Sequence, residues 1–428
     1  MPDLDTIFAL SSGSPPAGIA VVRVSGPDAN RALLLLTGRS MPKPRTATVA
    51  LLMDPDTRLP LDHALTLAFP RPKSATGEDV VELHLHGGRA VVAAVLNSLS
   101  QIKGLRPAEP GEFTRRAFEN NRIDLAQAEG LGDLLSAETE AQRRSAIAQV
   151  GGSLHRLTEA WIRQLLQISA RVEAVIDFSD EDDVDVLSVT MVRADVSAIV
   201  DDIKLRLANP PAERLHSGLR VAIIGPPNSG KSTLFNCLVN RDAAIVSEIP
   251  GTTRDVIEGA VKMRGLSLVF VDTAGIREET DDPIERLGVE RSRVESQTAD
   301  IVLALGGWGN HDSDTLTIDI SAKSDLQRNS NGLQISATTG EGIPELIDAI
   351  TAAARSILPA EDGVALNARH RSVLIASIAE LQMINAQSNE LLIAEHLRMA
   401  RKEIGKVVGG SDAEAMLDIL FGAFCIGK

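Results

Sequence analysis

A glycine-rich segment of eight residues limits most strongly what this chain can fold into. Residues 225–232 read Gly-Pro-Pro-Asn-Ser-Gly-Lys-Ser and directly follow the mainly apolar run 220–224. This is the P-loop pattern, and a strand before it and a helix after it are the context that the pattern requires. Backbone N–H groups of such a loop and Lys231 surround a phosphate, and the Ser232 hydroxyl binds Mg²⁺. The segment therefore predicts a nucleotide-binding α/β domain.

Two later segments are typical of the switches of a nucleoside triphosphatase. Residues 251–255 read Gly-Thr-Thr-Arg-Asp, where Thr253 can bind Mg²⁺ and the γ-phosphate. The apolar run 268–271 leads into Asp-Thr-Ala-Gly, which places Asp272 near the metal and the Gly275 amide near the γ-phosphate. We therefore expect hydrolysis of a triphosphate at this site.

The base is predicted to be guanine. Residues 322–325 read Ala-Lys-Ser-Asp where an Asn-Lys-x-Asp motif belongs, and Asp325 can accept both guanine N–H donors. Ala322 lacks the amide of the usual Asn, and losing one such hydrogen bond costs roughly 0.5–3 kcal/mol, so we expect weaker affinity with the guanine preference retained. The residues predicted to contact GTP are Asn228, Ser229, Gly230, Lys231, Ser232, Thr233, Ser247, Glu248, Ile249, Pro250, Gly251, Thr252, Thr253, Asp272, Thr273, Ala274, Gly275, Lys323, Asp325, Ser336 and Ala337.

The 428 residues predict a multidomain chain, since domains hold roughly 150 residues each. Short β-branched runs at 19–24 and 80–85 between Gly and Pro turns indicate a small α+β domain over residues 1–120. Apolar spacings of three and four predict helices from 125 to 207 and again from 366 to 420. The expected layout is a helical domain of residues 121–213 and 367–428, with a Ras-like P-loop GTPase domain inserted at 214–366.

Composition narrows the class of protein. No run approaches the roughly 20 apolar residues of a membrane span, the start of the chain lacks a secretory signal, and two cysteines give no disulfide framework, so a cytoplasmic location is expected. The net charge of −15 argues against nonspecific coating of nucleic acid. Aromatic residues make up 3% and Tyr is absent, so a base-stacking platform is not expected. Any RNA contact must be local.

Five further motifs extend the pattern over nearly the whole chain. They are Thr-Gly-Glu-Asp-Val-Val-Glu-Leu at 76–83, His-Gly-Gly at 86–88, Pro-Gly-Glu-Phe-Thr-Arg-Arg-Ala-Phe at 110–118, Asp-Leu-Ala-Gln-Ala-Glu at 124–129 and Cys-Ile-Gly-Lys at 425–428. With these motifs the chain resembles the MnmE (TrmE) family of tRNA uridine-modification GTPases, within the Era-like class of P-loop GTPases. The resemblance implies an N-terminal folate-binding and dimerising domain beside a helical domain that carries an inserted nucleotide domain.

The resemblance also implies an activity. With an MnmG-type flavoprotein containing FAD, a GTP-driven cycle would add an aminomethyl or carboxymethylaminomethyl group to C5 of the wobble uridine (U34) of certain tRNAs. The implied cofactors are GTP, Mg²⁺, K⁺ and a tetrahydrofolate derivative, 5-formyl or methylene, that supplies the carbon. The implied assembly is a homodimer that joins its flavoprotein partner in a heterotetramer or larger complex.

Residue roles follow from the same resemblance. The implied potassium ligands are Asn228, Ser247, Ile249 and Thr252, and the ion would replace an arginine finger when two nucleotide domains meet. Glu285 matches the glutamate that orients the attacking water, and Cys425 is a nucleophile or a polar support near the one-carbon unit. The implied folate contacts are Arg23, Glu82, Lys428 and Arg122, the last where the family has Lys.

Other interpretations remain open from the residues. A regulatory or ribosome-assembly GTPase of the Era-like kind would use the same nucleotide domain as a binding switch, without folate. A degenerate scaffold has Ala322 as its sole support and is opposed by Lys231 and Thr253. His84 and His86 lie at i and i+2 on one strand face but lack a third metal ligand in the sequence pattern, so structural or folate-pocket roles are expected.

Overall fold

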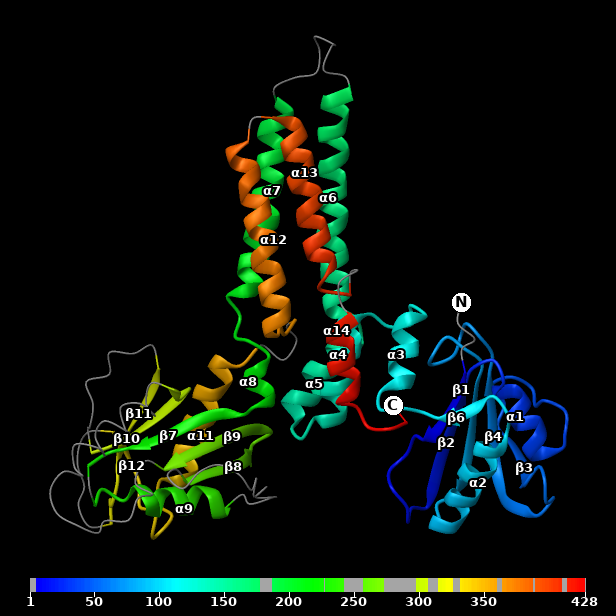
Figure 1. The fold of residues 1–428 in the computed structure, drawn as a ribbon. Coiled ribbons are helices and arrows are strands. Elements are labelled where there is room, and N and C mark those ends of the chain that lie inside the picture. Colours follow the sequence, from blue (N-terminus) through cyan, green and yellow to red (C-terminus); the bar gives the residue numbers. More distant parts are fainter. Residues whose placement is uncertain are drawn as a thin grey trace. The chain divides into compact units, whose positions relative to one another are not determined.

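The structure is a computed structural model that describes residues 5–177, 187–226, 228–241, 257–272, 298–306, 315–325, 332–359, 364–387, 389–409 and 414–427. The chain divides into two compact units (Figure 1). The first contains Met1–Gly132 and Val408–Lys428, and the second contains Asp133–Val407. Among the described residues, no helix combines the length and the apolar character that crossing a bilayer demands.

The first unit is built on a six-stranded sheet with the order β3-β4-β5-β2-β1-β6, in which only β1 and β6 pair in parallel. Its elements are β1 (Thr6–Leu10), β2 (Ile19–Ser25), α1 (Ala29–Thr37), β3 (Thr48–Met53), β4 (Pro60–Phe69), β5 (Val80–His86), α2 (Arg89–Gln101), β6 (Leu105–Pro107) and α3 (Glu112–Glu119). Alternate strand residues such as Val22 and Leu83 form one core with Leu36 of α1 and Leu99 of α2. The predicted strands at 19–24 and 80–85 are β2 and β5.

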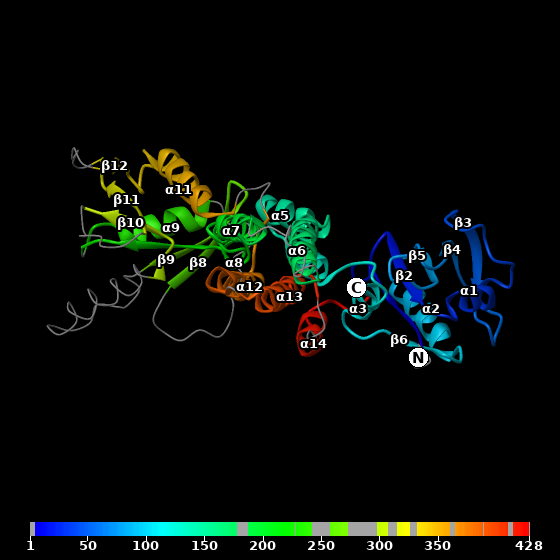
Figure 2. The same ribbon diagram turned by 90° about the horizontal axis from the view of Figure 1, so that it is seen from above.

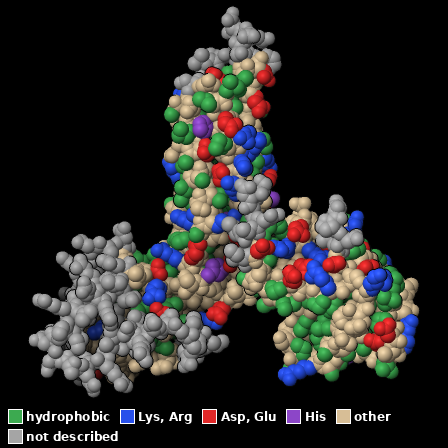
Figure 3. Space-filling view, viewed as in Figure 1, with side chains coloured by type: hydrophobic (Ala, Val, Ile, Leu, Met, Phe, Trp, Pro, Cys, Tyr) green, Lys and Arg blue, Asp and Glu red, His purple; other side chains and the backbone are tan. Residues whose placement is uncertain are grey.

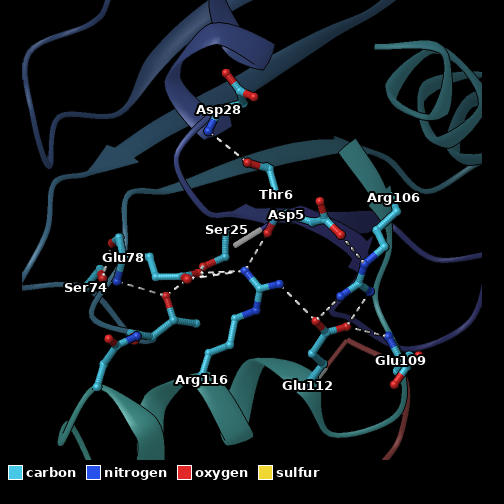
Figure 4. Close-up of polar contacts among 12 residues, drawn as sticks. Asp5, Thr6, Ser25, Asp28, Ser74, Glu78, Arg106, Glu109, Glu112 and Arg116 are labelled. Atoms are coloured by element: carbon cyan, nitrogen blue, oxygen red, sulfur yellow. Dashed lines mark hydrogen bonds and ion pairs between the residues drawn. The ribbon is translucent and has the colours of Figure 1, made fainter. Parts of the chain in front are cut away.

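A network of buried charges joins four segments of this unit (Figure 4). The Arg116 side chain is 4% exposed and donates to both oxygens of Glu78, to Glu112 Oε1 and to the Asp5 carbonyl. Arg106 donates to both oxygens of Glu112 from the other side, at 2.9 and 2.6 Å. Since buried charges are tolerated only when they are paired, the motifs at 76–83 and 110–118 supply the partners that this core requires.

Glu112 makes the stability of this unit depend on pH. Burial raises its pKa, but hydrogen bonds from Arg106, the Glu109 N–H and Arg116 outweigh burial, so the pKa lies below its ordinary value of 4.5. A lowered folded-state pKa stabilises the fold above the unfolded-state value, and this stability is lost as the pH falls through the folded-state pKa. We expect the free energy of unfolding of the first unit to fall steeply below about pH 4.5, with a smaller slope in Glu112→Gln, as measured by hydrogen exchange of β1 and β6 against pH. Equal slopes in the two proteins would contradict this assignment.

The C-terminal segment, residues 408–428, packs with the first unit, whereas the sequence placed all of residues 367–428 in the helical domain. Phe421 of α14 (Glu414–Gly422) lies against Phe118 and Phe424, with ring centroids 6.5 and 6.1 Å apart. Ile426 forms an antiparallel bridge with Pro110. The predicted helix is therefore present as α14, but its aromatic residue Phe421 is buried against α3.

The second unit contains a bundle of four long helices, α6 (Ser153–Asp177), α7 (Leu187–Leu207), α12 (Ala368–Ala386) and α13 (Glu390–Gly405), which Figure 2 shows from above. Two shorter helices precede it, α4 (Leu125–Ser136), which crosses from the first unit, and α5 (Glu140–Val150). Trp161 of α6 is 2% exposed and donates from Nε1 to Asp202 of α7 at 2.8 Å.

A second six-stranded sheet in the same unit has the order β12-β11-β10-β7-β9-β8 and is parallel except at β8. Its elements are α8 (Glu213–His216), β7 (Leu219–Ile224), α9 (Lys231–Arg241), β8 (Ile257–Met263), β9 (Leu266–Asp272), β10 (Ile301–Leu305), β11 (Leu316–Ser321), β12 (Leu333–Gln334) and α11 (Ile343–Ile357). We call these elements the nucleotide domain. Its place between α7 and α12 in the chain confirms the predicted fold class of an α+β domain, a helical domain and an inserted P-loop domain.

Candidate functional site

The P-loop leaves β7 through a glycine that no other residue could replace without displacement of its neighbours. Gly225 has φ +156°, and a Cβ there would lie 2.9 Å from the Leu305 Cβ and 3.0 Å from the Leu305 carbonyl oxygen of β10. Gly230, just before α9, has φ +99°, which side chains rarely adopt. The two glycines therefore let the backbone turn back over the end of the parallel sheet.

Lys231 and Ser229 give this loop the character of an anion site. The Lys231 ammonium donates to the Gly225 and Pro226 carbonyl oxygens at 3.0 Å each, so its charge lies within the curve of the loop. The Ser229 hydroxyl is buried and makes no hydrogen bond within the part of the chain that the structure describes. A buried hydroxyl normally has a partner. The residues present therefore fit a phosphate group, which would accept hydrogen bonds from both side chains.

The oxygens that could hold Mg²⁺ lie on neighbouring elements. Ser232 and Thr233 are exposed in the first turn of α9, and Asp272 ends β9 with 2% exposure. The β7–β9 register pairs Ile223 with Asp272, which places this carboxylate at the same sheet edge as the P-loop. Hydroxyl and carboxylate oxygens are ligands that Mg²⁺ prefers.

The candidate base-reading loop is joined to the P-loop. Lys323 has φ +63° and donates from Nζ to the Asn228 carbonyl oxygen at 2.7 Å. Asp325 is exposed, whereas Ala322 packs against the hydrophobic core of the nucleotide domain. Ser336 is fully buried, and its hydroxyl accepts from the Thr339 N–H at 3.2 Å; Ala337 follows it.

Several predicted site residues lie outside the described residues, so their positions are not assigned. They are Ser247, Glu248, Ile249, Pro250, Gly251, Thr252, Thr253, Thr273, Ala274, Gly275, Glu285 and Lys428.

In the first unit, Arg23 and Glu82 meet on the sheet face opposite the α1 and α2 core. They are cross-strand partners on β2 and β5, and Arg23 donates from Nε and Nη2 to Glu82 Oε1 at 3.1 and 2.9 Å. The guanidinium lies 5.7 Å from the ring centroid of Phe113 of α3. His84 Nε2 lies 3.4 Å from the second Glu82 oxygen. The sequence suggested only a general pocket role for His84; its position two residues after Glu82 on one strand face is the signal that indicates this contact.

The other predicted residues of this region have different surroundings. Arg122 donates from Nε to the Ser74 carbonyl oxygen at 3.2 Å. Cys425 is exposed, and a Cβ on Gly427 would lie 2.1 Å from the Leu10 carbonyl oxygen. Because β1 pairs Leu10 with Val22, the C-terminal segment passes within one strand position of Arg23.

The sheet is parallel around β7, a P-loop follows β7, and a buried aspartate ends the neighbouring strand β9. These features define a P-loop nucleotide-binding protein. The family models for the "MnmE helical domain" and the "GTP-binding protein TrmE N-terminus" match residues 125–425 and 6–122. The chain belongs to the MnmE (TrmE) family.

Individual relatives agree with that assignment. A protein of Novosphingobium aromaticivorans is 50% identical over 99% of this chain and 100% of its own length, and one of Erythrobacter litoralis is 50% identical over the same shares. Both are named tRNA modification GTPase MnmE.

A solved structure of Aquifex aeolicus Era bound to GDP and AlF4⁻ aligns at 24% identity over 41% of this chain and 69% of that chain, with a TM-score of 0.25.

Proposed function

We propose that this chain is a GTP-hydrolysing enzyme of tRNA modification. The observation that carries the proposal is the 50% identity to proteins named tRNA modification GTPase MnmE over 99% of the chain. The anion site formed by Lys231 and Ser229 supports it, since a triphosphate needs such a site. On the face shown in Figure 3, Lys and Arg side chains lie among Asp and Glu, which fits a local tRNA contact better than a nonspecific RNA coat.

The residues of the nucleotide site would each have a separate role in phosphoryl transfer. Lys231 would stabilise negative charge on the phosphates, Ser232 and Thr253 would hold Mg²⁺ with Asp272 nearby, and Glu285 would orient the attacking water. Asp325 would read guanine, and Lys323 would hold the base-reading loop to the P-loop. Potassium, when bound, supplies positive charge in place of an arginine finger. Its ligands would be Asn228, Ser247, Ile249 and Thr252.

A tetrahydrofolate derivative would bind in the first unit. Folate carries carboxylates and N–H donors, and the Arg23–Glu82 pair offers a cation and a carboxylate that are 23% and 18% exposed. Arg122, Lys428 and Cys425 would complete this site. Folate, when bound, supplies the one-carbon unit, while these residues bind and orient it.

The details of the proposed reaction are those that the resemblance to the family implies. Together with an MnmG-type FAD-containing partner, a cytoplasmic homodimer would add a (carboxymethyl)aminomethyl group to C5 of U34. Closure of two nucleotide domains in potassium would drive the cycle.

One experiment tests the main proposal. Purified protein is titrated with 5-formyl-tetrahydrofolate, and its GTPase rate is measured in sodium and in potassium salts. Binding together with faster hydrolysis in potassium supports the proposal, and no response in either assay overturns it. Binding of ribosomal RNA without folate would instead favour the alternative, an Era-like ribosome-assembly GTPase acting as a binding switch.

Ala322→Asn should tighten binding of guanine nucleotide. The new amide can hydrogen-bond the base, and such a bond contributes about 0.5–1.5 kcal/mol, which corresponds to roughly a two- to tenfold lower Kd. Calorimetric titration with GDP measures it. Ala322→Ser, whose hydroxyl is shorter than an amide side chain, is the control and should leave Kd close to that of the unchanged protein. An unchanged Kd in Ala322→Asn would contradict the assignment of this loop.

A further inference from the structure

Helix α5 docks on the nucleotide domain through a glutamine that is 5% exposed. Gln142 Nε2 donates to the Leu215 carbonyl oxygen of α8 at 2.8 Å. The Gln142 Oε1 atom accepts from the Thr139 N–H and completes a capping box at the start of α5. Ala141, the preceding residue, packs against the hydrophobic core of the nucleotide domain. The Gln142 side chain therefore stabilises the first turn of α5 and also binds this helix to α8 of the nucleotide domain.

The same helix region contacts the turn between β8 and β9. Lys262 Nζ lies 3.3 Å from Glu138 Oε2, just before α5. The turn itself has positive φ at Arg264 and Gly265, 48° and 82°, and Arg264 pairs with Asp348 of α11 at 2.7 Å. A Cβ on Gly265 would lie 3.8 Å from the Glu140 Cβ. The turn is therefore held between α5 and α11.

The β8–β9 hairpin connects this joint with the phosphate site. In the sequence, β8 directly follows the Gly-Thr-Thr-Arg-Asp motif, and β9 ends at Asp272 of the Asp-Thr-Ala-Gly motif. Seven residue pairs join the strands, from Ile257–Asp272 to Met263–Leu266, which spans about 20 Å at roughly 3.3 Å per residue. The paired strands therefore connect the phosphate end of the hairpin with its turn through continuous strand pairing.

The interface between α5 and the nucleotide domain contains a pocket. A cavity of about 110 Å³ is lined by Ala141, Ser145, Leu215, Leu266, Arg355, Leu358 and Pro359. This pocket is partly open to solvent, so α5 is not closely packed against the nucleotide domain on that side.

We propose that Gln142 is a positioning residue that transmits the state of the nucleotide site to the helical bundle, through the joint of α5, α8 and the β8–β9 turn. The proposal rests on the GTPase function proposed above. Gln142 holds α5 to α8, the β8–β9 hairpin lies in the chain between the two phosphate-site motifs, and α5 is followed at once by α6 of the bundle.

The test is hydrogen–deuterium exchange of the full chain in Mg²⁺ and K⁺, with GDP alone and with GDP plus aluminium fluoride. In the unchanged protein, exchange should differ at least twofold between the two states in α9, in the β8–β9 hairpin and in α5. Gln142→Glu keeps the capping box, which accepts Glu or Gln, but loses the donor to Leu215. In this variant the α5 difference should disappear while the hairpin difference remains, and Arg143→Gln on the exposed side of α5 should behave as the unchanged protein.

Four outcomes are decisive. A hairpin response without an α5 response in the unchanged protein overturns the proposal, as does an α5 response that persists in Gln142→Glu. Lack of any response in α9 and the hairpin instead overturns the proposed GTPase function, so the two failures are distinguishable. If Gln142→Glu does not fold, Lys262→Met removes the second contact, and an undiminished α5 response in that variant overturns the proposal.

Discussion

Replacing Arg116 by methionine should lower the free energy of unfolding of the first unit by about 3–5 kcal/mol, the usual effect of removing one partner from a buried ion pair. The guanidinium is 4% exposed and holds Glu78, Glu112 and the Asp5 carbonyl oxygen. Methionine is shorter and carries no charge, so Glu78 would lose its cation in the core, whereas Glu112 would keep its pair with Arg106. The loss therefore comes mainly from the uncompensated charge of Glu78.

Native-state hydrogen exchange of the β1 and β6 amides measures this change within the full chain. Arg31→Met is the matched control, because Arg31 is 51% exposed and its pair with Asp28 spans 3.6 Å. Exposed pairs contribute about 0–1 kcal/mol. Equal losses in the two variants would show that the network does not hold the unit together.

Lys231→Met should reduce kcat/KM for GTP by a factor of about 10²–10³, the range seen when one donor is removed from charge that develops in a transition state. The Lys231 ammonium already lies within the P-loop, 3.0 Å from two carbonyl oxygens, so its position needs little rearrangement before a phosphate accepts from it. Methionine keeps most of the unbranched side chain and removes the terminal ammonium group with its charge and donors.

The GTPase rate in potassium measures the effect, and Lys204→Met, at an exposed position on α7, is the control and should change kcat/KM by less than twofold. A loss below tenfold in Lys231→Met would place the catalytic phosphate contact elsewhere. A loss confined to KM would show that the lysine binds GTP and its transition state equally.

Local signals predicted much of this fold. The apolar run before Gly225 predicted β7, because a strand that is buried on both faces shows no alternation of polar and apolar residues. The last four residues of β7 are buried. The runs at 19–24 and 80–85 gave β2 and β5 within one residue of their ends. The hairpin β3–β4 was not predicted, because β3 is an edge strand and the burial of both strands alternates only in part.

Long-range partners could not be predicted from the sequence. Glu78 and Arg116 are separated by 38 residues, and nothing in either motif specifies that they form a buried pair. Arg23 and Glu82 were named through family resemblance, whereas their direct contact depends on the β2–β5 register. The Lys323 contact with Asn228 likewise requires two loops that only the folded sheet brings together.

The return of the C-terminal segment to the first unit has a consequence for synthesis on the ribosome. Ile426 pairs with Pro110, and Phe421 packs on Phe118, so residues made after the second unit complete a unit whose sheet was made before it. At roughly 5–20 residues per second, the sheet waits tens of seconds for these partners while the whole second unit emerges. Until then, the side of Phe118 that packs on Phe421 lacks its native cover, so apolar surface of the first unit stays exposed on the nascent chain while the second unit is made.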